Sequence, residues 1–87
     1  MADLNLNFMH PTDSRLISVT LDSSMTGQET ISELIAAGFI PASREGYNLS
    51  VKGGNQIDNN KNLSENQVRE NDTIRVIPAT DAGFQII

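Results

Sequence analysis

The chain has 87 residues, which is the length of one small domain with a single hydrophobic core. Apolar residues make up 38% of it and charged residues 20%, which excludes a disordered polyelectrolyte and a membrane-spanning chain. Eleven acidic against six basic residues give a formal charge of −5. We therefore expect proteins as partners, and neither nucleic acid nor an anionic membrane.

Missing residue types and signals narrow the function further. The chain has no cysteine, which excludes disulfides, thiolate metal sites and a cysteine nucleophile. It has one histidine, His10, so a histidine-based zinc motif within the chain is excluded and we expect no metal or other cofactor. The amino terminus, MADLNLNF, lacks the layout of a secretory signal, so we expect a cytoplasmic protein.

Two strands open the predicted fold. Leucine and phenylalanine alternate with polar residues over residues 3–9, the period of two that indicates a strand with one buried face. Turn-forming residues fill positions 10–14, and the alternation returns over residues 17–21. The two segments are expected to pair as a β-hairpin.

A helix follows the hairpin. From residue 26 onward, apolar residues recur at the i, i+3, i+4 spacing of one helical face. Thr26 and Glu29 fit a capping box at its start. Gly38 lies where a residue of positive φ ends many helices, and Pro41 prevents the helix from resuming. The pattern predicts a helix of about twelve residues.

The second half of the chain predicts two or three more strands. Residues 47–51 alternate like a strand, and the short run around 56–58 is at most an edge strand. Leu63 and Val68 are apolar anchors for a packed loop. Residues 73–78 are predicted to form the last strand. It ends at Pro78, because proline has no N–H to donate to a neighbouring strand.

The order of elements indicates an α+β fold of the β-grasp kind. We expect a ββαββ chain in which one helix packs on one face of a mixed sheet. The domain is assigned to residues 1–78, and residues 79–87 are assigned to a flexible C-terminal tail.

No group of residues predicts catalysis, so the chain is not expected to be an enzyme. His10, Asp13 and Ser14 share one hairpin loop and lack the convergence on rigid elements that a triad needs. Glu29 is explained by helix capping and Glu33 by solvent exposure.

Residues 54–83 resemble ubiquitin and align with it without a gap. The family reads G-x-Q-L, T-L-S, I, T-L-x-L-V and a final G-G. The residues of this chain at those motifs are Gln56-Ile57, Asn62-Leu63-Ser64, Val68, Thr73-Ile74-Arg75-Val76-Ile77 and Ala82-Gly83. The resemblance implies a ubiquitin-like protein, similar to bacterial modifiers that carry an extension after the conjugating glycine.

What the resemblance implies for the tail is a processed modifier. Gly83 would be the conjugating residue and Phe84 the first residue removed by a metallopeptidase of the deubiquitinase kind. An ATP-dependent activating enzyme and a conjugating enzyme would then join Gly83 to amines of target proteins. Asp81 and Ala82 depart from the basic residues and the glycine of the family, so they would be recognised by a dedicated activating enzyme.

The sheet face opposite the helix is the second candidate site. Period-two alternation points Lys52, Arg75 and Ile77 outward, and we predict that they form a partner-binding surface. Ile77 matches a valine of ubiquitin's apolar recognition patch, whereas Ser50 and Lys52 flank the place of its central isoleucine. The surface is therefore expected to be more polar than the patch of ubiquitin.

The lysine positions argue against polymeric chains. Lys52 and Lys61 are the only lysines, and the family's usual chain-linking positions are Asn55 and Glu70 here. The resemblance therefore implies single attachment or none.

Two alternatives stay open beside the modifier. One is a non-covalent interaction module that resembles the ubiquitin-like components of specialised secretion systems. The other is a sulfur carrier, which uses a C-terminal glycine thiocarboxylate. Nine residues follow Pro78, which favours the modifier over the interaction module. Ala82 and the residues after Gly83 count against the sulfur carrier.

Overall fold

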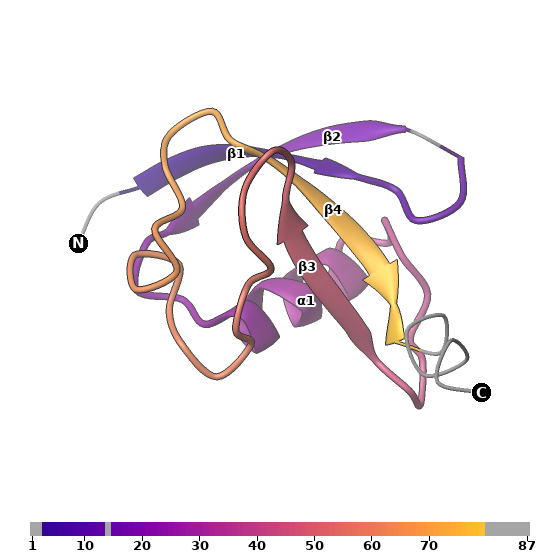
Figure 1. The fold of residues 1–87 in the computed structure, drawn as a ribbon. Helices are drawn as coiled ribbons and strands as arrows, with labels where there is room; N and C mark the ends of the chain where they lie inside the picture. The colour runs from indigo at the N-terminus through magenta and orange to yellow at the C-terminus, as the bar shows by residue number, and fades with distance from the viewer. Residues whose placement is uncertain (1–2, 14, 80–87) are drawn as a thin grey trace.

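A four-stranded mixed sheet with one helix across one face forms the fold (Figure 1). The computed structural model describes residues 3–13 and 15–79. The elements are β1 (Asp3–Met9), β2 (Leu16–Asp22), α1 (Gly27–Ala36), β3 (Tyr47–Val51) and β4 (Thr73–Pro78). The predicted β-grasp fold and its ββαββ order are confirmed. Most of the predicted tail, residues 80–87, lies outside the described residues.

The first and last strands pair in parallel at the centre of the sheet. The strand order is β2-β1-β4-β3, with Asn7 opposite Thr73 and Met9 opposite Arg75. The outer pairs, β1 with β2 and β3 with β4, are antiparallel. Because a parallel pair needs a long crossover connection, the chain between these two strands carries α1 over one face. Within residues 3–13 and 15–79, no further helix or strand covers the opposite face.

Apolar side chains fill the space between the sheet and α1. They come from alternate strand positions and from one stripe of the helix, as the two sequence periods predict. Leu63 and Val68 are buried and anchor the loop before β4. The other buried apolar residues are Leu6, Phe8, Leu21, Ile31, Leu34, Phe39, Ile40, Tyr47, Leu49, Ile57, Ile74 and Val76.

Both ends of α1 carry the predicted caps. The Glu29 N–H donates to Thr26 Oγ1 at 3.1 Å, and the Thr26 N–H donates to Glu29 Oε1 at 2.9 Å. Gly38 has a φ of 79°, which suits a residue without Cβ. The helix has ten residues rather than about twelve, because Ala37 already forms its C-cap.

Residues 55–59 cover the outer edge of β3. The Ile57 N–H donates to the Leu49 carbonyl at 2.8 Å, and Asn59 Nδ2 donates to the Tyr47 carbonyl at 3.2 Å. The run around residues 56–58 is reduced to one isolated bridge, between Gln56 and Ser50. This edge of the sheet is therefore covered.

The contact of α1 with the sheet gives a stability prediction. Leu34 is only 1% exposed on the inner face of the helix, so Leu34→Ala should lower the free energy of unfolding by about 2–5 kcal/mol. Urea denaturation measures the change. Ser32→Ala, at an exposed position of the same helix, is the matched control and should stay within about 0.5 kcal/mol. A neutral Leu34→Ala variant would contradict the described packing.

Candidate functional site

The free face of the sheet brings the predicted surface residues together. Arg75 on β4 is exposed and pairs with Ser50 on β3 and with Met9 on β1. Ile77 lies two residues further along β4 and therefore on the same face. Lys52 follows β3 directly, and its N–H donates to the Thr73 carbonyl at 2.8 Å. The geometry agrees with the predicted placement, and partner binding by these residues stays a prediction.

Two apolar residues that the sequence analysis did not select lie in the same row. Met9 pairs with Leu16 on one side and with Arg75 on the other, so one row crosses three strands. Leu16 is 59% exposed, and it is the one large exposed apolar residue among those described. Met9, Leu16, Arg75 and Ile77 are called the Arg75 patch below.

The polar side chains that β1 and β2 place on this face bond one another. Ser18 Oγ donates to Asn7 Oδ1 at 2.8 Å, and Thr20 Oγ1 donates to Asn5 Oδ1 at 2.6 Å. Asn5 Nδ2 in turn donates to Glu70 Oε2 at 2.7 Å. A partner would gain little by replacing these bonds, because each exchange of equivalent hydrogen bonds is nearly neutral.

A groove of about 250 Å³ borders the Arg75 patch. It lies between β4 and the loop that joins β1 to β2, because β1 ends opposite Arg75 whereas β4 continues to Pro78. The lining residues are Met9, His10, Pro11, Thr12, Arg75, Val76 and Ile77.

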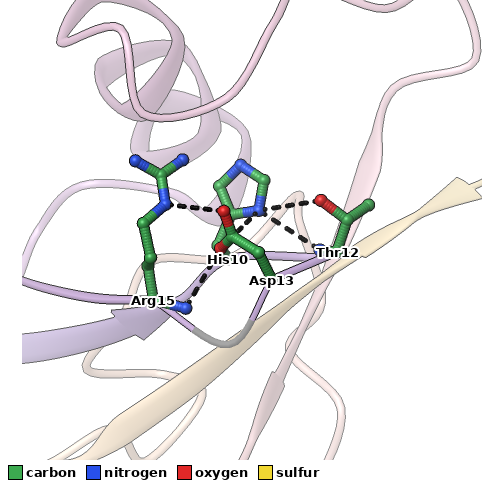
Figure 2. Close-up of polar contacts among 4 residues, drawn as sticks. All are labelled: His10, Thr12, Asp13 and Arg15. Carbon is green, nitrogen blue, oxygen red and sulfur yellow. Dashed lines mark hydrogen bonds and ion pairs between the residues drawn. The ribbon is translucent and has the colours of Figure 1, made fainter.

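Polar contacts hold the loop that forms one wall of this groove (Figure 2). His10 Nδ1 accepts the Thr12 N–H at 3.2 Å and lies 3.3 Å from Asp13 Oδ1. Arg15 Nε pairs with Asp13 Oδ2 at 2.8 Å, and the Arg15 N–H donates to Asp13 Oδ1 at 3.1 Å. The imidazole meets the Phe39 ring edge-on, with the ring centroids 5.2 Å apart. The positive charge of Arg15 is therefore paired within the loop.

The same contacts shift the titration of Asp13. Desolvation raises the pKa of its carboxyl, but the hydrogen bonds from Arg15 and the charges of Arg15 and His10 outweigh it, so this pKa lies below the usual value. The loop carboxylate thus stays charged and engaged with its own loop.

Neither a metal site nor a catalytic triad is found in the described part of the chain. No group of three or more His, Cys, Asp or Glu residues within 3–13 and 15–79 could hold a metal ion. Ser14, the third member of the rejected triad, lies outside those residues. No described helix is long and apolar enough to cross a bilayer.

The tail residues of the sequence analysis lie outside the described residues. Asp81, Ala82, Gly83 and Phe84 therefore keep their predicted roles as predictions. The last described residue is Ala79, whose N–H donates to the Gly46 carbonyl at 3.1 Å. This contact fixes where the chain leaves the sheet, at the end of its central strand β4.

Comparisons with known proteins show which solved structures share this fold. No family model matches the chain, and no curated protein matches it. The chain is similar to a solved structure that concerns molecular mimicry of SUMO in DNA repair, with a TM-score of 0.72 and 16% identity over 86% of this chain and 90% of that one. Ubiquitin of Caldiarchaeum subterraneum gives 0.70 and 14% over 88% and 94%. A de novo design based on ubiquitin gives 0.68 and 18% over 85% of both chains. These likenesses establish a ubiquitin-like fold.

Glu70 ties the loop before β4 to β1, and this contact predicts a pH dependence. Its Oε1 accepts the Asn5 N–H at 2.9 Å and its Oε2 accepts Asn5 Nδ2. The backbone bond and then the side-chain bond from Asn5 lower the Glu70 pKa below its ordinary value of 4.5. The carboxylate therefore stabilises the fold above pH 4.5, and this stabilisation is lost as the pH falls through the lowered pKa.

Glu70→Gln should remove this component. In urea denaturation over a pH series, wild type should be more stable than the variant near neutrality, and the difference should shrink in acid. Glu33→Gln is the matched control, because that carboxylate is exposed and bonds no described residue. A wild-type advantage over Glu70→Gln that stays constant down to the acid transition would contradict the contact.

Proposed function

We propose that this chain is a ubiquitin-like protein modifier, made as a precursor, cleaved after Gly83 and conjugated through the Gly83 carboxylate. It would act in the cytoplasm as a substrate of enzymes rather than as an enzyme. One observation carries the proposal: the gapless alignment of residues 54–83 with ubiquitin places its apolar motif positions in the core. These positions, all buried, are Ile57, Leu63, Val68, Ile74 and Val76. Counted on from these positions without a gap, the alignment assigns Gly83 to the place of ubiquitin's last glycine, which supports the proposal.

The proposed chemistry requires a free carboxylate at Gly83. A metallopeptidase would direct a zinc-bound water at the carbonyl of Gly83, releasing the segment that begins at Phe84. An activating enzyme would join the new carboxylate to AMP from ATP, with release of pyrophosphate. A cysteine thiolate of the activating enzyme would displace AMP and form a thioester with Gly83. A cysteine thiolate of the conjugating enzyme would then take over the thioester and release the first thiolate. A target amine would finally displace this second thiolate and form the amide bond.

Glycine suits the reacting position. Without a Cβ it takes any φ and lets the segment pass through narrow active sites. Gly83 is the fourth residue after Ala79, so a fully extended chain would reach at most about 14 Å from the sheet. The reacting carboxylate can therefore reach an enzyme while the folded domain stays outside the catalytic cleft.

The partner enzymes would be specific to this modifier. Asp81 stands where the family has a basic residue, and Ala82 replaces the penultimate glycine. An activating enzyme built for arginine would meet a carboxylate at position 81 and repel it. We therefore propose a dedicated activating enzyme that recognises Asp81 and Ala82.

Gly83→Ala tests the conjugation step. In cells that carry an N-terminally tagged protein, the variant should lose its covalent conjugates on a denaturing gel, because the reacting residue is changed. Its urea denaturation curve should match that of wild type. Thr80→Ala, another tail variant, is the matched control and should keep the conjugates. Undiminished conjugates of Gly83→Ala would remove Gly83 from the mechanism.

A second candidate function is a non-covalent interaction module. The Arg75 patch favours it, because the exposed Leu16 and a cation that pairs with no described carboxylate share one face of the sheet. Under this reading the chain stays uncut beyond Gly83 and recognises partners through the sheet alone. Conjugates that depend on Gly83 would separate the modifier from this alternative.

A further inference from the structure

We propose that the Arg75 patch and its groove bind a short extended segment of a partner protein that carries a carboxylate two residues from an apolar side chain. The inference rests on the proposed function only in taking the chain to be recognised by other proteins. It does not require cleavage or conjugation at Gly83.

The first observation is the unpaired charge of Arg75. Its row neighbours Met9 and Ser50 are uncharged, and no described carboxylate forms an ion pair with its guanidinium. The loop across the groove supplies no partner either, because the carboxylate of Asp13 is engaged by the side chain and the N–H of Arg15. A guanidinium offers a fork of donors that fits a carboxylate in two parallel hydrogen bonds.

The second observation is the apolar surface around this charge. Leu16 is 59% exposed and pairs with Met9. Pro11 of the loop and Ile77 of β4 add apolar surface to the lining of the groove. Methionine adapts its shape to irregular partners, so Met9 suits a contact surface. An apolar side chain of a partner would remove this surface from water at the same place where a carboxylate meets Arg75.

The spacing along β4 defines the order of side chains in the partner. Arg75 and Ile77 are two residues apart on one strand and face the same way, roughly 7 Å from each other. An extended segment repeats its side chains on one face at the same spacing. A carboxylate at one position and a leucine two residues away would therefore meet Arg75 and the groove together.

Charge and chemistry select a protein segment over other occupants. A nucleic acid or an anionic membrane needs several cations in one patch, whereas the Arg75 patch holds one cation with Lys52 beside it, in a chain of net charge −5. A small carboxylic acid would leave Leu16 uncovered. Because the polar side chains of β1 and β2 beside the patch already bond one another, the footprint is short, and the partner is a linear segment rather than a broad domain surface.

Two blocked heptapeptides test the proposal, SLSDSLS and its asparagine counterpart SLSNSLS. Each is titrated into the ¹⁵N-labelled full chain while amide chemical shifts are followed. The aspartate peptide should shift the amides of Met9, Thr12, Leu16, Arg75 and Ile77. It should bind about tenfold more tightly than the asparagine peptide, as expected for a hydrogen bond between two charged groups.

Two variants assign this preference to Arg75. Arg75→Gln should abolish the preference for aspartate, and its spectrum before titration shows whether it remains folded. Arg44→Gln is the matched control, because Arg44 is exposed outside the patch, and it should keep the preference. Arg75→Lys should restore part of it, because lysine keeps the charge but not the fork.

Three results would overturn the proposal. They are equal affinity of the two peptides for wild type, shifts confined to residues outside the patch and groove, and no shift with either peptide at millimolar concentration. None of them bears on Gly83, so a failed peptide titration and a failed conjugation test are read separately.

Discussion

The parallel pairing of β1 with β4 is the constraint on which the rest of the structure depends. It joins the first and last strands at the centre of the sheet, with Met9 opposite Arg75. Glu70 reinforces it by accepting both the backbone and the side-chain N–H groups of Asn5, and the Asn71 N–H donates to the Asn5 carbonyl at 2.7 Å. The connection between the two strands must cross the sheet, and α1 lies on the face that it crosses, so no described helix covers the other face.

The same pairing creates the candidate site. The ladder between the two central strands ends at Arg75, and the chain after Met9 turns away into the loop held by Asp13 and Arg15. β4 continues alone on that side to Pro78, and the groove opens in the space that β1 has left. The strand that forms one wall of the groove also leads toward Gly83. β4 thus contributes to the free face and also precedes the tail in the chain.

Local patterns in the sequence predicted the fold well because each element has its own period or cap. Alternation fixed which strand residues face the helix, and Thr26 with Glu29 fixed where the helix begins. The candidate site was predicted only in part. Arg75 and Ile77 follow from alternation along one strand, but Leu16 and Met9 join them through the register of strands distant in sequence, which no local pattern contains.

Long-range contacts were missed for the same physical reason. The bond between Glu70 and Asn5 spans 65 positions, and neither residue stands out in a period or motif. Phe39 follows the helix, yet it packs against His10 of the first loop. Pairings of this kind depend on the three-dimensional path of the chain. Glu70 stands where the family has a chain-linking lysine, and this position does not predict its contact with Asn5.

The free face differs from the apolar patch of ubiquitin because it combines a charged side chain with apolar ones. Arg75, which pairs with no described carboxylate, lies among apolar side chains here, so recognition would join a directional charged contact to apolar burial. Such a surface discriminates among partners more sharply than an apolar patch does, because a wrong partner leaves the charge unpaired. A modifier with a dedicated set of enzymes would benefit from that selectivity.

Intact mass spectrometry of the protein recovered from its own host tests the central claim most directly. The account predicts a species that ends at Gly83, shorter by the four residues after it, and the same species linked through an amide bond to amines of other proteins. A population in which every molecule retains Ile87 and none is linked would contradict the modifier, and the sheet face would then be the functional part of the molecule.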